Sequence, residues 1–313
     1  MACRNEMTFG VGRILTNPKN QWEDIKSAAR GRIRIAFRGI DVDWEKYNTK
    51  DYLFTHCTAV CSVETEDNGY WIKPACEELV NANGNAWTNV VLMNSFKTFI
   101  GAENYLEHRQ DPVLSKGKIL DAILRPVKHH SEKYNQDANV YFCDILVATA
   151  RIHEDLVERI ESGELTGLSM GCVANVVTCS ICGKQIKDDD RDCEHLSRHL
   201  GKMVECSDGK ERICAELCGA VDEKGEYVPD SVVFIEESWV QNPACQFCLI
   251  NSFVETEEER KFRIEKKDEL QKLFDGNLFE RLRVADKESK IALKIVKESV
   301  HIDRLAKRLL DEI

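Results

Sequence analysis

Short runs of apolar and β-branched residues recur along most of the chain and predict strands. They cover residues 52–63, 117–124, 140–150 and 231–240. Ile152, Leu156 and Ile160 repeat at a spacing of four residues, and this predicts one short amphipathic helix. Gly163 follows them as the residue just beyond the helix end. The pattern therefore predicts a mostly β body with a few helices, because strands and helices do not alternate as in a parallel doubly wound sheet.

The pattern changes at about residue 255, where the chain becomes highly charged. Apolar residues then return at near-heptad spacing: Ile291, Ile295, Ile302, Leu305 and Leu309. We therefore divide the chain into a body of residues 1–254 and a charged, helical C-terminal segment of residues 255–313. Two interpretations of this segment stay open. It is a helical hairpin that folds back on the body, or a detachable tail that binds a partner helix.

The composition is that of a globular protein, since 43% of the residues are apolar and 31% are charged. The 43 basic and 54 acidic residues give a net charge of -11. This charge argues against direct binding to nucleic acid. No apolar run reaches the roughly 18 residues of a membrane span, and the first residues do not resemble a secretory signal. From these features we expect a protein of a cytosol, with no membrane partner.

Fourteen cysteines occur in this chain, which shows no secretory signal. They predict reduced thiols and a metal site rather than a disulfide framework. The densest group lies in a segment of about residues 172–206, which we interpret as an insertion. There the pair Cys179 and Cys182 is followed by Cys193, His195 and His199. This spacing is typical of structural zinc sites.

Two ligand sets fit this spacing. If the segment after Cys193 is helical, His195 and His199 lie on one face and both bind the metal. If Cys193 begins that helix, it binds together with one histidine. A second, looser group comprises Cys214, Cys218, Cys245 and Cys248. We interpret these four as incidental thiols rather than as a second zinc site.

Residues 167–171 read Gly-Leu-Ser-Met-Gly, which matches the G-x-S-x-G string of α/β-hydrolases. In that fold the serine sits on a sharp turn between a strand and a helix. Here the residues that follow are β-branched and not helical, and no HGGG-type loop is present. A lipase or esterase of that fold is therefore disfavoured.

A wider match runs from Phe99 to Ala244. Its pieces are Glu107-His108, a G-x-I-x-D-A strand at residues 117–122, S-G-x-L-x-G-x-S-M-G at residues 162–171, and F-x-E-x-S-x-V-x-x-P-A at residues 234–244. In this order they resemble the prohead (capsid maturation) proteases of tailed phages, which share a fold with the herpesvirus assembly proteases (assemblin-like fold). The resemblance implies an α+β fold: a mostly antiparallel, β-barrel-like core with a few surrounding helices. To this the chain would add a zinc-knuckle insertion and a helical C-terminal tail.

The same resemblance assigns catalytic roles. Ser169 would be the nucleophile, and His108 the general base that takes its proton. Glu236 would orient the imidazole, while Asp121 and Asp144 stay open as alternatives because both lie in strands near the expected site.

Strand alternation places Glu236 on one face with Phe234, Ser238 and Val240. That face is otherwise largely apolar. A carboxylate there needs a partner, because a buried charge without one is costly.

Zinc-bearing relatives of these proteases carry a C-x-H sequence at the corresponding place. This favours Cys179, Cys182, Cys193 and His195 as ligands of a structural Zn²⁺ that the chemistry does not require. By resemblance the chain is a serine endopeptidase that processes scaffold protein, major capsid protein, other head proteins and itself. It would act inside the assembling prohead in the host cytoplasm, and its self-association stays open. The alternative is a zinc-stabilised, non-catalytic virion or scaffold protein with the same fold.

Overall fold

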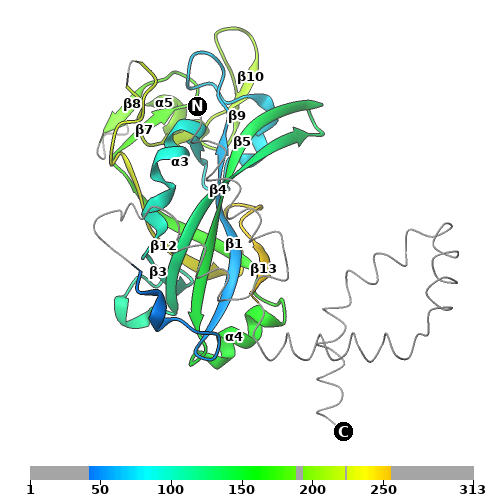
Figure 1. The fold of residues 1–313 in the computed structure, drawn as a ribbon. Helices are drawn as coiled ribbons and strands as arrows, with labels where there is room; N and C mark the ends of the chain where they lie inside the picture. The colour runs from blue at the N-terminus through cyan, green and yellow to red at the C-terminus, as the bar shows by residue number, and fades with distance from the viewer. Residues whose placement is uncertain (1–41, 188–192, 223, 255–313) are drawn as a thin grey trace, which may run out of the picture. The chain divides into compact units, whose positions relative to one another are not determined.

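The computed structural model describes residues 42–187, 193–222 and 224–254 (Figure 1). The chain divides into two units, Met1–Thr256 and Glu257–Ile313, and every described residue belongs to the first. The predictions for the C-terminal segment lie outside the described residues. No helix within the described ranges is long and apolar enough to cross a membrane.

The main sheet contains β1 (Tyr52–Val63), β2 (Asn85–Thr88), β3 (Glu103–Leu106), β4 (Gly117–Ser131), β5 (Gln136–Ala150), β6 (Gly167–Ala174), β7 (Val176–Cys179), β8 (Gln185–Lys187), β11 (Glu216–Cys218), β12 (Val232–Val240) and β13 (Ile250–Phe253). A separate hairpin is formed by β9 (Met203–Glu205) and β10 (Glu211–Ile213). The described α-helices are α3 (Asn89–Ser95), α4 (Glu154–Glu161) and α5 (Glu194–His199). Short 3-10 helices are η2 (Trp44–Lys46), η3 (Pro74–Leu79), η4 (Phe96–Phe99) and η5 (Pro112–Leu114).

The main sheet is mixed and open. Its strand order is β6-β12-β3-β4-β5-β1-β2-β11-β7-β8, with β13 paired to β1. The pairs β1–β2, β2–β11 and β3–β12 are parallel, and the other pairs are antiparallel. The α+β prediction, with many strands and few helices, is confirmed. The prediction of a barrel-like closure is wrong, because β6 reaches the segment before β13 only through the isolated bridge between Gly167 and Leu249.

The four apolar runs all correspond to strands of the structure, as predicted. The prediction of the helix after residue 151 is confirmed in part. Within α4, Leu156, Val157 and Ile160 are buried. Gly163 follows the C-cap with a φ of 77°, a conformation that glycine adopts without steric cost. Ile152, however, precedes the helix and is 84% exposed. Its apparent place in the period was coincidental.

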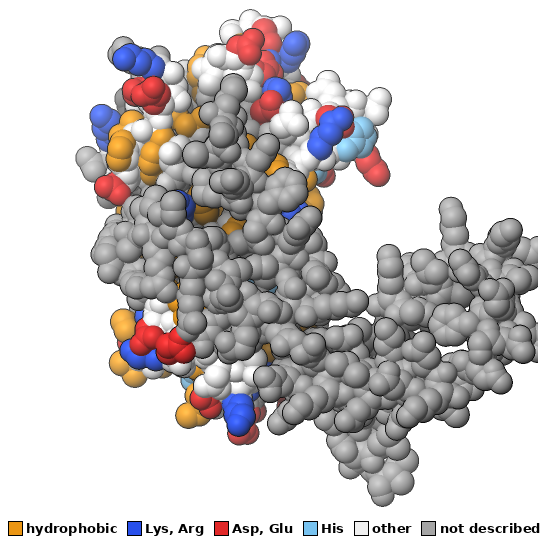
Figure 2. Space-filling view, viewed as in Figure 1, with side chains coloured by type: hydrophobic (Ala, Val, Ile, Leu, Met, Phe, Trp, Pro, Cys, Tyr) orange, Lys and Arg blue, Asp and Glu red, His pale blue; other side chains and the backbone are white. Residues whose placement is uncertain are grey.

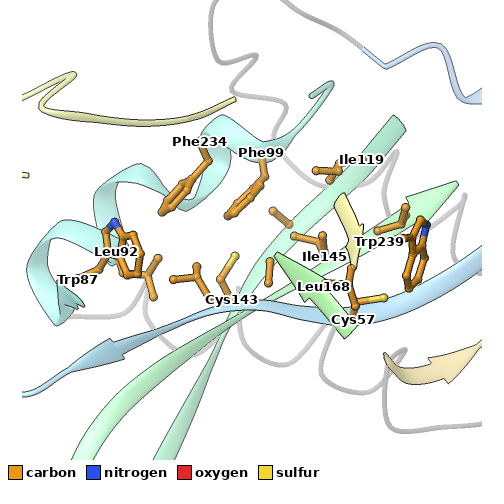
Figure 3. Packing of buried hydrophobic residues seen from close by; sticks show 14 of the residues in the cluster. Cys57, Trp87, Leu92, Phe99, Ile119, Cys143, Ile145, Leu168, Phe234 and Trp239 are labelled. Carbon is orange, nitrogen blue, oxygen red and sulfur yellow. The ribbon is translucent and has the colours of Figure 1, made fainter. Parts of the chain in front are cut away.

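The core beneath β6 and β12 is packed by large apolar side chains (Figure 3). Phe99 and Phe234 stack with their ring centroids 4.3 Å apart and an interplanar angle of 6°. Leu168 and Trp239 are fully buried, and the indole nitrogen of Trp239 donates to Thr149 Oγ1 at 3.1 Å. This packing fixes one face of the two strands, so their other face can carry polar side chains at defined positions.

Figure 1 places α4 at one end of this unit and the segment from β7 to β10 at the other. On the face shown in Figure 2, acidic and basic side chains of the described residues are interspersed near this second end.

Candidate functional site

Ser169 lies in the interior of β6 and pairs directly with Ser238 of β12. The strand β7 follows β6, so the serine is not on a strand-to-helix elbow. The flanking glycines serve close packing instead. A Cβ on Gly167 would lie 2.7 Å from the carbonyl oxygen of Val240, so this position has no room for a side chain.

A β-bulge in β12 decides which side chains share a face. Phe234 pairs with Cys172, whereas Glu236 pairs with Gly171, so β12 advances two residues while β6 advances one. Phe234 and Glu236 therefore point to opposite faces. The prediction that they share a face is wrong, because simple alternation assumes no bulge. Glu236 lies two residues before Ser238, the partner of Ser169, so it shares the face that carries Ser169, and the bulge turns Phe234 to the opposite face.

Glu236 is a buried carboxylate with three hydrogen-bond donors. It is 1% exposed. Its Oε1 accepts from His108 Nδ1 at 2.8 Å and from Gln110 Nε2 at 3.2 Å, and its Oε2 accepts from Ser238 Oγ at 2.6 Å. Because a carboxylate only accepts, the proton of the imidazole lies on Nδ1. The other ring nitrogen, Nε2, is then free to act as a base.

Gly171 makes the position of Glu236 possible. A Cβ at Gly171 would lie 2.5 Å from Glu236 Oε1 and 3.1 Å from Gln110 Nε2. Any side chain there would push the carboxylate away from His108. Glycine is therefore required at position 171 because the carboxylate of Glu236 occupies the space of a side chain, and not because the chain turns there.

His108 is held in a strained turn after β3. Glu107 and His108 have φ values of 51° and 53°, a left-handed conformation that costs a non-glycine residue about 1–3 kcal/mol. The turn is tied to the end of β12, since Glu107 N donates to Trp239 O and Gln241 N donates to Glu107 Oε1, both at 2.9 Å. Such strain is concentrated at functional sites.

The pKa of His108 is raised above its usual 6.5. The hydrogen bond to Glu236 is the main cause, and partial burial works in the opposite direction. The side chain is 42% exposed, so solvent reaches the ring while the buried carboxylate fixes its orientation.

A cavity of about 450 Å³ is lined by both His108 and Ser169. Leu168, Met170 and Trp87 contribute apolar wall. In the described part of the chain, no hydrogen bond joins Ser169 to His108. Catalytic hydrogen bonds are often long in a free enzyme and tighten when substrate binds. The cavity therefore brings a hydroxyl and an oriented imidazole to one space.

The other two acids considered as partners of His108 lie elsewhere. Asp144 is buried and is bound by Arg125, whose Nε donates to Oδ2 at 2.6 Å. Asp121 lies in β4. Of the three candidates, Glu236 is the one with a hydrogen bond to His108 among those found in the described residues.

A second group of chemically competent side chains lies at the β7–α5 end. The ligand atoms of Cys179, Cys182, Cys193 and His195 all lie within 4.8 Å of one another. The sulfurs of Cys182 and Cys193 are 3.7 Å apart, and tetrahedral zinc at about 2.3 Å from each sulfur would separate them by about 3.8 Å. His199 is not part of the group. These four residues can hold a metal ion.

The local structure explains how the four ligands meet. Cys179 ends β7, Cys193 is the N-cap of α5, and His195 lies in the first turn of that helix. Between them, Gly183 adopts a φ of 69°. Cys172 belongs to β6 and does not contribute, and β7 and β8 are strands of the main sheet. The segment is therefore built into the sheet rather than attached to it.

A polar cluster anchors this segment to the body. Trp71 Nε1 donates to Ile181 O at 2.9 Å, and the guanidinium of Arg212 lies 4.0 Å from the ring centroid of Trp71. Arg212 is also paired with Glu66 and Asp208 at 2.9 and 2.8 Å. The candidate metal ligands are thus held by groups from distant parts of the chain.

Two of the remaining four cysteines differ from the prediction of reduced thiols. Cys245 and Cys248 form a disulfide, and the sulfur of Cys61 lies within 4.8 Å of both. Their C-x2-C spacing allows a metal pair and a disulfide equally, so the sequence did not distinguish the two. Cys214 and Cys218 are free and buried.

The sequence analysis placed Ser238 on the same face as Glu236 but gave it no role. It missed Gln110 as a neighbour of Glu236. Gln110 had no sequence signal, since its contact depends on the strained turn at His108.

Comparisons of the chain with protein-family models, with curated proteins and with solved structures found no match. The function is therefore inferred from the geometry of the site.

Proposed function

We propose that this chain is a serine endopeptidase with Ser169 as nucleophile, His108 as general base and Glu236 as the orienting acid. The observation that carries the proposal is the 2.8 Å hydrogen bond from His108 Nδ1 to the buried Glu236. It fixes one tautomer of the imidazole, beside a cavity that Ser169 also lines. A triad needs this arrangement, because a neutral serine is a poor nucleophile without an oriented base.

The proposed reaction uses these three residues in turn. His108 Nε2 takes the proton of Ser169 Oγ as the oxygen attacks the carbonyl carbon of a peptide. The imidazolium that forms is stabilised by Glu236, which keeps its own charge. His108 then gives the proton to the leaving amine, and an acyl-enzyme remains on Ser169. Water, activated by the same imidazole, releases the acid product.

The candidate metal site would have a structural role. Three thiolates and one imidazole suit Zn²⁺, and four protein ligands leave no open position for substrate. Cys179, Cys182, Cys193 and His195 would then form a zinc knuckle that closes the β7–α5 turn. None of the four lines the cavity, so the metal would act on stability and not on the chemistry.

The sequence resemblance to prohead proteases supports a biological setting for this activity. Scaffold protein, major capsid protein, other head proteins and the chain itself would be the substrates, inside an assembling prohead in the host cytoplasm. The alternative is a zinc-stabilised virion or scaffold protein that keeps the fold without cleaving. The two differ in whether Ser169 is activated.

A fluorophosphonate probe tests that difference without knowledge of the substrate. An activated serine oxygen displaces fluoride from phosphorus and keeps the phosphonyl group, which mass spectrometry locates. We expect labelling at Ser169 in the full chain, none in Ser169→Ala, and a loss of at least about 100-fold in His108→Ala. The control variants Ser162→Ala and His130→Ala change exposed residues outside the cavity and should label normally.

Self-cleavage and cleavage of co-expressed head proteins give the second readout. Ser169→Ala should leave both uncut, while Ser162→Ala should give the fragments of the natural chain. Absence of labelling and of cleavage in the natural chain would reject the protease and favour the non-catalytic alternative.

A further inference from the structure

The cavity beside Ser169 has an uneven distribution of charge. Among the described residues that line it, Glu216 provides the one carboxylate, and none is lysine or arginine. His108 belongs to the catalytic arrangement. The remaining described lining is apolar, amide or thiol in character, apart from Ser169 itself and the disulfide-bonded Cys245. A substrate side chain that enters the cavity therefore meets a fixed negative charge.

Two paired strands hold Glu216 in place. It begins β11 and lies in register with Asn85, the first residue of β2. Asn85 Nδ2 donates to Glu216 Oε2 at 2.9 Å. Within the described ranges no cation forms an ion pair with this carboxylate, and its Oε1 accepts no hydrogen bond. The group is half-buried, and one of its oxygens remains available to a ligand.

Neighbouring amides complete a site suited to a cation. Asn81, Asn83 and Asn85 line the same part of the cavity, and the side chain of Asn81 orders the loop by accepting from the backbone nitrogens of Asn83 and Asn85. Amide oxygens can accept hydrogen bonds from an ammonium or a guanidinium group. The apolar wall formed by Trp87 can cover the aliphatic stem of a lysine or arginine.

We infer that Glu216 is a specificity-determining residue that selects substrates with a lysine or arginine near the cleaved bond. The inference rests on the proposed protease function, because it assigns this cavity to the substrate. A half-buried carboxylate attracts a cation and repels an anion in a partly desolvated space. Acidic side chains would bring a like charge next to Glu216, so selection comes from repulsion as well as attraction.

Cleavage profiling of a mixed peptide library tests this. The natural chain should cut peptides with lysine or arginine at one fixed position at least about tenfold faster than peptides with glutamate there. Glu216→Gln should remove that preference, and Glu216→Lys should reverse it toward acidic side chains. The matched control Glu226→Gln changes an exposed carboxylate outside the cavity lining and should keep the natural profile.

A binding measurement separates failure of this inference from failure of the protease function. Ser169→Ala, with and without Glu216→Gln, is mixed with the same library, and bound peptides are identified by mass spectrometry. Enrichment of basic peptides that depends on Glu216 supports the inference even if no variant cleaves. Cleavage or binding without a basic preference, or a preference that survives Glu216→Gln, overturns it and leaves the serine chemistry to be judged by the labelling experiment. Thermal unfolding of each variant checks that the strands β2 and β11 remain folded.

Discussion

Ser169 and Ser238 lie directly opposite each other on the antiparallel strands β6 and β12, and they have different tasks. Ser238 donates to Glu236 Oε2 at 2.6 Å and is fully buried. Ser169 is half-exposed and lines the cavity. One cross-strand pair thus joins the candidate nucleophile to the hydroxyl that supports the acid. Strand register sets the positions of Ser169 and Glu236, and the turn after β3 sets that of His108.

Replacement of Glu236 should change the pH dependence of the reaction. His108 must be neutral to act as a base, and its raised pKa means that the rate increases as pH rises through a value above 6.5. Glu236→Gln removes the charge that raises this pKa, so the acidic limb should move to lower pH while the plateau rate falls. The fall should be smaller than in Ser169→Ala, because the nucleophile remains. The measurement is kcat/KM for a cleaved peptide between pH 5 and 9.

The variant Asp144→Asn is the control for this prediction. Asp144 is bound by Arg125 and should affect stability without moving the acidic limb. A larger loss of rate in Asp144→Asn or Asp121→Asn than in Glu236→Gln would show that Glu236 is not the orienting acid.

Gly171→Ala should damage the site while it keeps all three side chains of the triad. The added Cβ would lie 2.5 Å from Glu236 Oε1, so the carboxylate must move. A displacement of about 1 Å in a catalytic arrangement can cost about 100-fold in rate. We expect a loss of that order, and a pKa of His108, measured by NMR, that falls toward its usual value. A normal rate with an unchanged His108 pKa would contradict the position of Glu236.

The metal ligands can be tested with two histidines of the same helix. His195 lies in the four-residue group, and His199, one turn later, does not. His195→Ala should lose the metal and unfold at lower temperature, whereas His199→Ala should retain it. Elemental analysis of the purified full chain should give one zinc per molecule, and chelation should lower its unfolding temperature. Equal metal content in the two variants would reject this ligand set.

Many of the strands were predictable from the sequence, because burial of apolar side chains produces both the local sequence pattern and the strand. The run at residues 52–63 became β1 with the same limits. The run at residues 117–124 predicted only the first half of β4, since the later part of that strand alternates with charged residues. The open sheet was not predictable, because closure depends on long-range pairing of β6, which no local pattern records.

The site shows the same division between local and long-range information. The motifs placed Ser169, His108 and Glu236 in one candidate group, and the structure brings His108 and Glu236 into contact. The bulge between Phe234 and Glu236 was not predictable, because the extra residue of a bulge has no distinct sequence signal in a strand that mixes apolar and polar residues. The choice between His195 and His199 likewise depended on where α5 begins, and Cys193 as its N-cap brings His195 into the group.

Glu237, next to Glu236 in the chain, points to the opposite face and into the core. It is fully buried, and neither of its carboxyl oxygens has a hydrogen-bond partner in the described part of the chain. Burial is the main cause that raises its pKa well above 4.5, and the charge of Glu236 adds to the effect. The folded protein therefore keeps this proton at pH values where the unfolded chain has released it.

This difference predicts that stability falls as pH rises above the ordinary glutamate pKa of 4.5. In that range the folded state binds one more proton than the unfolded state, and each pH unit costs about 1.4 kcal/mol until the raised pKa is reached. Glu237→Gln removes the titration, so its free energy of unfolding should decline less steeply between pH 5 and pH 8. Urea unfolding at several pH values measures how the free energy of unfolding of the natural chain and of the variant depends on pH. The control Glu226→Gln changes an exposed carboxylate and should keep the pH dependence of the natural chain. Parallel slopes for Glu237→Gln and the natural chain would mean that Glu237 is ionised in the fold, and a buried partner for it would then have to exist.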